Sequence, residues 1–328
     1  MPRRSRQFAP SLPGWGSWHA AAAPRIPVRA GPTRQPRWLT GPGRRAASEL
    51  MPPPPPPPPP PPAVLCYHRV GGPLELGVTR VPTAVFERHM EALARDGWHT
   101  LTLEGFATRL QRGVVASCNE FLLTFDDGYA SLAEYAYPIL DRLGFTATTF
   151  LITDHVGSLN TWDVRYTWRR LAHLDWPAIE HWKARGLEFG SHGASHRRLT
   201  WLSDAEAAAE LERSRETLQR RLGPDAARAV AYPFGARDAR VQRLAGAAGY
   251  DLGFGGVRGN GSALNVSRVP VYLWDAGRTP VGVRRDVVGR LGRAIAHVAN
   301  RCAVGTSVMQ GVRCWVSGVR GPYPAPNA

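Results

Sequence analysis

The sequence is poor in cysteine and lysine, and it contains no long apolar run. Lys183 is the single lysine among 328 residues, and the four cysteines are Cys66, Cys118, Cys302 and Cys314. None of them forms a CxxC pair, which argues against a disulfide framework and against a thiolate zinc site. No stretch of 18 consecutive apolar residues occurs. The sequence therefore predicts no helix that crosses a membrane.

Net charge is absent from the middle of the chain. Residues 63–275 contain 24 basic and 24 acidic residues, whereas residues 1–62 contain nine arginines and one acid, and residues 276–328 contain eight arginines and one acid. The formal net charge of +15 thus belongs to the two ends. A folded domain with a basic, nucleic-acid-binding face is not predicted. Binding of a polyanion through the arginine-rich ends stays an alternative.

The composition of the two ends predicts extensions outside the folded domain. Residues 1–62 combine scattered arginine and much proline, and they cannot bury enough apolar surface to fold. Within them, eleven consecutive prolines at 52–62 predict a polyproline II segment, interpreted as a low-complexity extension. Residues 276–328 are rich in glycine and arginine, with one short helix predicted over 287–298. Because residues 9–23 lack the apolar core of a signal peptide, the sequence leaves the cellular compartment open.

Between these ends, short apolar runs alternate with amphipathic patterns over a length sufficient for one large core. Strands are predicted at 63–67, 120–125, 146–152, 187–190, 228–232 and 266–273. Helices are predicted from Pro82 onward and over 132–143, 203–222 and 239–248, the third with a Ser203–Glu206 capping box. This alternation predicts an α/β fold with parallel strands and covering helices, and the length favours a barrel.

Two polar segments directly follow predicted strands. Asp126 and Asp127 are adjacent carboxylates, which repel each other unless a cation or proton transfer uses them, although Asp-Asp-Gly is also a common turn. His192 and His196 are four residues apart, a spacing that lets both imidazoles reach one ion. Either histidine alone could be structural. With one aspartate the pair forms a set that leaves coordination positions open, as in catalytic metal sites.

Three segments in this order resemble the polysaccharide deacetylase family with the NodB-type domain, carbohydrate esterase family 4. They are TFDDG at 124–128, SHGASH at 191–196 and YPFG at 232–235, the last of which would by itself indicate an ordinary turn. The resemblance covers about 63–273. Its opening, CYHRV at 66–70, looks like the branch that deacetylates poly-N-acetylglucosamine. The resemblance implies a distorted, incomplete (β/α) barrel, which sets the catalytic domain at 63–275 between disordered extensions.

The same resemblance assigns a metal and a base. Asp127, His192 and His196 match the metal ligands of the family, and Zn²⁺ is the expected ion. Asp126 matches the general base, which takes a proton from the attacking water.

Two further roles follow from the resemblance. The backbone N–H of Phe234 matches the oxyanion donor, and His68 matches the general acid of the poly-N-acetylglucosamine branch. Many members have an arginine at the position of Ala231 that pairs with the catalytic aspartate. Arg268 is the candidate replacement here, with a plain surface ion pair as the alternative.

The predicted function is a metal-dependent hydrolase that removes N-acetyl groups from an N-acetylglucosamine-containing polysaccharide and releases acetate. Tyr232, Arg268, Trp162 and Trp168 are expected to contact the substrate, the tryptophans by stacking on sugar rings. The alternatives are an inactive carbohydrate-binding protein on the same scaffold and an amidase of a small N-acylated substrate. No protein partner is predicted, and the substrate favours the cell envelope or periplasm over the cytoplasm.

Overall fold

The computed structural model describes residues 62–73, 78–112, 119–160 and 170–284, together with residues 289, 291, 292, 294 and 295. The N-terminal extension up to residue 61 lies outside the described residues, as do Trp162, Trp168 and most of the predicted C-terminal tail. Within the described part, no helix has both the length and the apolar character needed to cross a bilayer.

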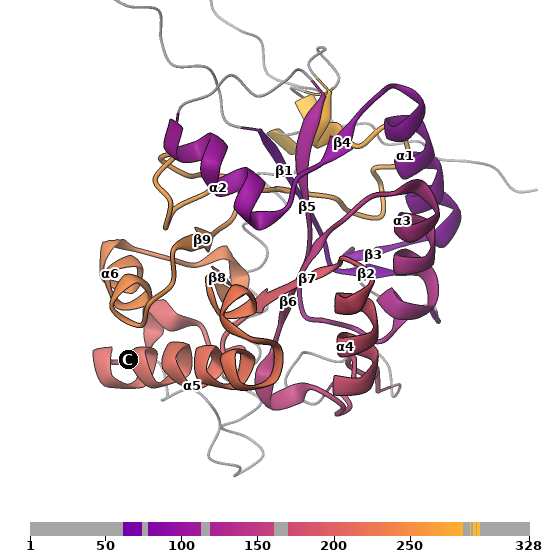
Figure 1. Cartoon of the computed structure of the whole chain (residues 1–328). Coiled ribbons are helices and arrows are strands. Elements are labelled where there is room, and N and C mark those ends of the chain that lie inside the picture. The colour runs from indigo at the N-terminus through magenta and orange to yellow at the C-terminus, as the bar shows by residue number, and fades with distance from the viewer. Residues whose placement is uncertain are drawn as a thin grey trace, which may run out of the picture. The chain divides into compact units, whose positions relative to one another are not determined.

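The centre of the domain is an eight-stranded sheet in the order β10-β1-β5-β6-β7-β8-β9, with β4 also paired to β5. Every pairing in it is parallel, as the βα alternation predicts. The sheet curls into an incomplete (β/α) barrel (Figure 1). Two short strands, β2 and β3, pair separately. The strand bounds are β1 Ala63–Tyr67, β2 Arg69–Val70, β3 Arg80–Val81, β4 His99–Thr100, β5 Glu120–Phe125, β6 Thr148–Leu151, β7 Glu188–Ser191, β8 Ala229–Ala231, β9 Leu252–Phe254 and β10 Val269–Pro270.

Helices cover the sheet, and the buried apolar side chains between helices and sheet form three clusters. The helices are α1 Thr83–Arg95, α2 Leu103–Arg112, α3 Tyr137–Leu143, α4 Trp176–Ala184, α5 Asp204–Leu222 and α6 Ala239–Ala247. The largest cluster joins α1, α3 and α4 to one face of the sheet, and a second joins α2 to β8 and β9. The third places α5 and α6 against β8. The predicted capping box is confirmed at the start of α5, where Ser203 and Glu206 exchange hydrogen bonds.

The two-residue period of the strands decides which side chains point into the barrel. In β5, Phe121, Leu123 and Phe125 belong to the large cluster beneath the helices, whereas Leu122 belongs to the cluster that includes β8 and β9. The residue after the strand, Asp126, is in phase with Leu122, so it continues the inward-facing row. This phase carries a carboxylate to the centre of the barrel mouth.

The predicted helix over 132–143 is divided in the structure. Leu132–Ala136 is π-helical, and α3 begins only at Tyr137. Pro138 occupies the first turn of α3, where its missing N–H has no intrahelical partner to lose. The widened turn before it lets the chain enter α3 without a clash at the proline ring. Gly144 ends the helix with a φ of +66°, as the sequence predicts.

The predicted strand at 266–273 is shortened to β10, because its residues change partners. Val266 makes an isolated parallel bridge with Phe254 of β9, whereas Val269 and Pro270 pair with β1. The segment therefore runs from one edge of the sheet to the other. Arg268 lies at the crossing point, and its buried side chain reaches Thr124 and Asp126.

Candidate active site

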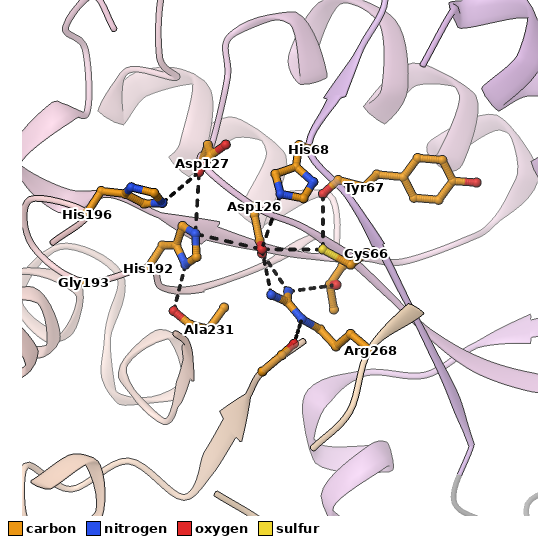
Figure 2. Close-up of polar contacts among 12 residues, drawn as sticks. Cys66, Tyr67, His68, Asp126, Asp127, His192, Gly193, His196, Ala231 and Arg268 are labelled. Carbon is orange, nitrogen blue, oxygen red and sulfur yellow. Dashed lines mark hydrogen bonds and ion pairs between the residues drawn. The ribbon is translucent and has the colours of Figure 1, made fainter. Parts of the chain in front are cut away.

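The polar side chains named above meet at one edge of the sheet. The ends of β1 and β5 are in register, with Tyr67 opposite Phe125, and the end of β7 is in register with β8 through Ser191 and Val230. Residues that follow parallel strands therefore gather at a common edge, which is where such folds place their functional groups. Figure 2 shows these side chains converging from β1, β5, β7 and the segment before β10.

Three side chains form a cluster that can hold a metal ion: Asp127, His192 and His196. Asp127 Oδ1 lies 3.5 Å from His192 Nε2 and 3.6 Å from His196 Nε2. All three residues are buried, and Figure 2 shows both imidazoles facing the carboxylate. The structure thus brings together the three residues that the family resemblance assigns to the metal.

The chemistry of this cluster fits a cation. His192 Nδ1 lies 2.7 Å from the carbonyl oxygen of Ala231, which can only accept, so Nδ1 carries the proton. Burial lowers the pKa of His192 and of His196, so both rings are neutral. The lone pair of His192 Nε2 then faces a carboxylate oxygen. Two electron-rich atoms at 3.5 Å repel each other unless a positive ion lies between them.

Strained backbone holds two of these three residues. Asp127 and His196 have φ angles of +69° and +62°, in the left-handed region that side chains other than glycine rarely adopt. Gly128 follows at +67°, and a Cβ there would come within 2.7 Å of Leu151. The carbonyl of Asp127 accepts a hydrogen bond from His173 Nδ1 at 2.8 Å. Such outliers are typical of functional sites, where surrounding contacts offset the strain.

Asp126 has a different set of neighbours. Arg268 donates from Nη1 to Oδ1 and from Nη2 to Oδ2, both at 2.7 Å, and the two side chains are 4% and 5% exposed. Burial favours the protonated carboxyl, but the Arg268 guanidinium outweighs it and holds the pKa of Asp126 well below its usual range. The carboxylate therefore stays ionised at neutral pH and points into the site in a fixed orientation.

Arg268 acts as the partner of Asp126 and not as a substrate contact. Its Nε donates to the carbonyl of Gly255, and Nη1 also lies 3.3 Å from Thr124 Oγ1. With its nitrogens engaged inside the protein, Arg268 presents no face to a substrate, so that part of the prediction is wrong. The small side chain of Ala231 leaves the barrel centre open to this guanidinium. Ala231 contributes its backbone carbonyl to His192 instead.

Tyr232 also requires a correction. Its side chain is fully buried in the cluster with α5 and α6, and its hydroxyl donates to the carbonyl of Leu264 at 3.0 Å. The side chain therefore cannot contact substrate. The other two predicted substrate residues, Trp162 and Trp168, lie outside the described residues.

Phe234 lies beside the metal-ligand cluster. It has a φ of +60° within the turn Pro233–Gly235, and its ring centroid is 4.6 Å from that of His196. The next residue, Gly235, passes so close to Gly256 that a Cβ would lie 2.7 Å from its backbone nitrogen. The turn is thus fixed against the β9 side of the barrel. Its role as an oxyanion donor stays a prediction.

His68 is on the other side of Asp126. Its Nε2 is 4.0 Å from Asp126 Oδ2, and its side chain is 24% exposed, so the ring borders both the carboxylate and the surface. Burial lowers the pKa of His68 to about 4. The ring is therefore neutral at pH 7, and service as a general acid, which stays a prediction, requires a proton gained during the reaction.

Cys66 is a neighbour of Asp126 that the motifs do not point to. Its Sγ lies 3.5 Å from Asp126 Oδ2, within reach of an S–H hydrogen bond. The strand period gives the available signal, because Cys66 is two residues before His68 and shares its direction. Cys66, His68 and Asp126 are also close enough to hold an ion. Arg268 occupies both Asp126 oxygens, however, and its charge disfavours a second cation there.

Aromatic rings and one guanidinium form a continuous row from the metal-ligand cluster to the surface. The Arg198 guanidinium carbon lies 6.0 Å from the ring centre of Phe234 and 4.9 Å from that of Trp201. Trp201 is 40% exposed. The row His196, Phe234, Arg198 and Trp201 thus connects a metal-ligand candidate to an accessible indole.

Comparison with known proteins agrees with this architecture. Residues 114–253 match the family model described as polysaccharide deacetylase. YxkH of Bacillus subtilis, provisionally named a polysaccharide deacetylase, is 27% identical over 190 residues. That alignment covers 58% of this chain and only 62% of YxkH.

Two solved structures share the fold. The deacetylase PplD of Streptococcus pyogenes, solved in complex with acetate, aligns with a TM-score of 0.59 and 22% identity, over 66% of this chain and 95% of PplD. IcaB of Ammonifex degensii aligns with a TM-score of 0.55 and 24% identity, over 71% of this chain and 96% of IcaB. The fold that the sequence resemblance implies is confirmed. Residues 114–253 are therefore similar to polysaccharide deacetylase domains, and the described domain shares the fold of PplD and IcaB.

Proposed function

We propose that this domain is a metal-dependent hydrolase that removes N-acetyl groups from an N-acetylglucosamine-containing polysaccharide and releases acetate. One observation carries the proposal. An ionised, arginine-paired carboxylate, Asp126, lies 3.9 Å from His192 Nε2, at the edge of an electron-rich cluster suited to a cation. A fixed base beside a metal site is one arrangement that can hydrolyse an unactivated amide.

The residues that would hold the metal are Asp127, His192 and His196. Two imidazoles and one carboxylate are a donor set of catalytic zinc sites, which keep a further position open, so Zn²⁺ is the proposed ion. When bound, such an ion acidifies water and withdraws electron density from a carbonyl oxygen.

The chain's own groups account for the proton movements. Asp126 takes a proton from water as the water oxygen bonds to the acetyl carbon, and Arg268 keeps the carboxylate aimed at that water. We propose that the N–H of Phe234 stabilises the negative charge that develops on the acetyl oxygen. When the carbon–nitrogen bond breaks, the amine nitrogen gains the proton that Asp126 took from water, and His68, 4.0 Å from Asp126 Oδ2, is the side chain placed to relay it. The products are acetate and a free amine.

The sugar polymer is the proposed substrate class for two reasons. The family model and YxkH are both named for polysaccharide deacetylation. In addition, the exposed indole of Trp201, linked to the cluster through Arg198 and Phe234, offers a face on which a sugar ring can stack.

Acetate release tests the proposal. The full chain is stripped with a chelator, reloaded with Zn²⁺ or Co²⁺, and incubated with N-acetylglucosamine and its oligomers of increasing length, and with a small N-acetylated amine. We expect acetate from the oligomers, none after chelation, and recovery on reloading. Activity confined to the small amine would favour the amidase alternative. Oligomer binding without any acetate release, metal present, would favour an inactive carbohydrate-binding protein.

A further inference from the structure

The loop that carries two of the three metal-ligand candidates is short and contains strained backbone. His192 and His196 are separated by three residues, and the loop contains positive φ angles at Gly193 (+78°) and at His196 (+62°). The positive φ of His196 is strained for a residue with a side chain, and such strain persists where surrounding contacts offset it. The contacts that neighbouring elements make with the loop therefore bear on the direction of the two imidazoles.

The contacts on one side come from a buried carboxylate of α5. Glu210 is 4% exposed, and its Oε2 accepts the backbone N–H of Ser195 at 2.9 Å. Its Oε1 accepts the Ser195 hydroxyl at 2.8 Å. Both oxygens are thus directed at the residue before His196. Hydrogen bonds to an ionised acceptor are roughly twice as strong as those between neutral groups.

The same face of α5 reaches the start of the loop. Ser214, one helical turn after Glu210, has its hydroxyl 2.7 Å from that of Ser191. Ser191 Oγ in turn accepts the N–H of Gly193 at 3.1 Å. Two polar side chains on one buried helix face therefore hold both ends of the histidine loop.

The opposite side of the loop is fixed by the chain after β6. The N–H of Asp154 donates to the carbonyl of Ala194 at 2.9 Å. Arg213 joins the two sides, because its Nη2 donates to Asp154 Oδ2 at 2.8 Å and to Glu210 Oε1 at 3.1 Å. The Glu210 carboxylate is thereby oriented as well as buried.

We propose that Glu210 is a positioning residue for the metal centre, setting the direction of His196 and hence the affinity of the Asp127, His192 and His196 cluster for a divalent cation. The inference rests on the proposed metal site and goes beyond the family's own residues. The hydrogen bonds of Glu210 described above run to Ser195 and Arg213. Its effect passes through Ser195. Residues that orient metal ligands typically change metal affinity by ~10–100-fold when replaced.

The test is Zn²⁺ affinity of Glu210→Gln, measured by competition with a chromophoric chelator. An amide has one oxygen, so its NH₂ group must face either the Ser195 N–H or the Arg213 guanidinium, both of which only donate, and we expect the affinity to fall by ~10-fold or more. Glu212→Gln is the matched control, because Glu212 is an exposed residue of the same helix. It should leave the affinity unchanged.

A second variant and a second readout keep the test decisive if Glu210→Gln folds poorly. Ser195→Ala removes one of the two hydrogen bonds and should weaken Zn²⁺ binding by a smaller factor. The visible spectrum of the Co²⁺-loaded protein should shift in both variants but not in Glu212→Gln, which a loss of general stability would not produce.

The outcomes separate this inference from the proposed function. If the unmodified chain binds no Zn²⁺, the metal site itself is refuted. If it binds Zn²⁺, and Glu210→Gln and Ser195→Ala match it in affinity and Co²⁺ spectrum, the positioning role is refuted while the hydrolase proposal stands.

Discussion

Adjacent aspartates at the end of β5 lie in opposite chemical environments. Asp127 faces two neutral imidazoles whose nitrogens are electron-rich, so its half of the site attracts a cation. Asp126 faces a guanidinium and a thiol that donate to it, so its half already contains a positive charge. The difference arises because Asp126 continues the inward phase of the strand, whereas Asp127 turns away at a φ of +69°.

This contrast shows how one dipeptide can supply two functions. The half with Asp127, His192 and His196, here the cation side, gains positive charge only when a metal is bound. The half with Asp126 and Arg268, here the arginine side, keeps a carboxylate ionised without a metal. The two halves also differ in how far the family model covers their residues. The family model spans both aspartates and both histidines, but Cys66, His68 and Arg268 lie outside its match to residues 114–253.

The largest expected effects come from exchanging each aspartate for asparagine. Asp126→Asn removes the base and should lower acetate release by ~10²–10⁴-fold, with the Zn²⁺ content near that of the unmodified chain. Asp127→Asn should abolish activity through loss of Zn²⁺, because an amide oxygen carries no charge. Metal analysis beside an acetate assay separates the two. Full activity of Asp126→Asn, or equal metal loss in both variants, would refute the division of roles.

The same division explains how much of the site the sequence could predict. The cation side consists of residues within two short motifs, each placed just after a strand, so strand phase and histidine spacing are sufficient to bring them together. The arginine side depends on residues 60 and 142 positions from Asp126, whose approach follows from the order of the sheet. The sequence points to Arg268 only because Ala231 stands where similar domains have an arginine, and the crossing of its segment from β9 to β1 brings it to Asp126.

Other predictions failed where a motif does not reveal burial. Tyr232 is next to the turn of Phe234, yet the alternation of β8 directs its ring into the cluster beneath α5 and α6. The π-helical turn before α3 likewise depends on how Pro138 enters the packed helix layer. The parallel pairing, by contrast, follows from the alternation of short apolar runs with amphipathic patterns along the sequence.

Removing the guanidinium from the arginine side gives the next largest effect. Arg268→Met leaves the Asp126 carboxylate buried without a partner, which should reduce the free energy of unfolding at pH 7 by about 3–5 kcal/mol. Arg268→Lys, the control, keeps the charge but cannot make both hydrogen bonds, so its free energy of unfolding should fall by less than that of Arg268→Met. Denaturant unfolding measures both.

The pH dependence of this deficit has a defined sign. The pair holds the folded-state pKa of Asp126 below its unfolded value, so its stabilisation is present above the unfolded pKa and is lost as the pH falls through the folded pKa. The stability deficit of Arg268→Met should therefore shrink in acid, as Asp126 becomes protonated and needs no partner. A deficit that is constant down to acid pH would contradict the ion-pair explanation.

A histidine behind the arginine side should account for part of the acid sensitivity of the fold. His89 of α1 is fully buried, shares a 3.0 Å hydrogen bond with Tyr67, and has a pKa lowered to about 4, chiefly by burial. The unfolded chain binds a proton at a pKa of about 6.5, so stability falls as the pH falls through that value toward 4. Between pH 7 and pH 5, we expect the free energy of unfolding of His89→Gln to fall by about 2 kcal/mol less than that of the unmodified chain. If the free energies of unfolding of the two proteins fall equally with pH, measured by denaturant unfolding, His89 does not take up a proton on unfolding.

The smallest effect concerns the outward end of the cation side. Trp201 is linked to His196 through Arg198 and Phe234 but lies too far along this row to touch the reacting acetyl group. Trp201→Ala should lower kcat/KM for longer N-acetylglucosamine oligomers by about 5-fold, equivalent to ~1 kcal/mol of ring stacking, and leave the shortest substrates and the Zn²⁺ content unchanged. Trp201→Phe, which keeps an aromatic face, should restore most of the loss. An equal loss on all chain lengths would instead indicate that Trp201 supports Phe234 and the metal cluster, which would make the row part of the cation side and not a surface for the polymer.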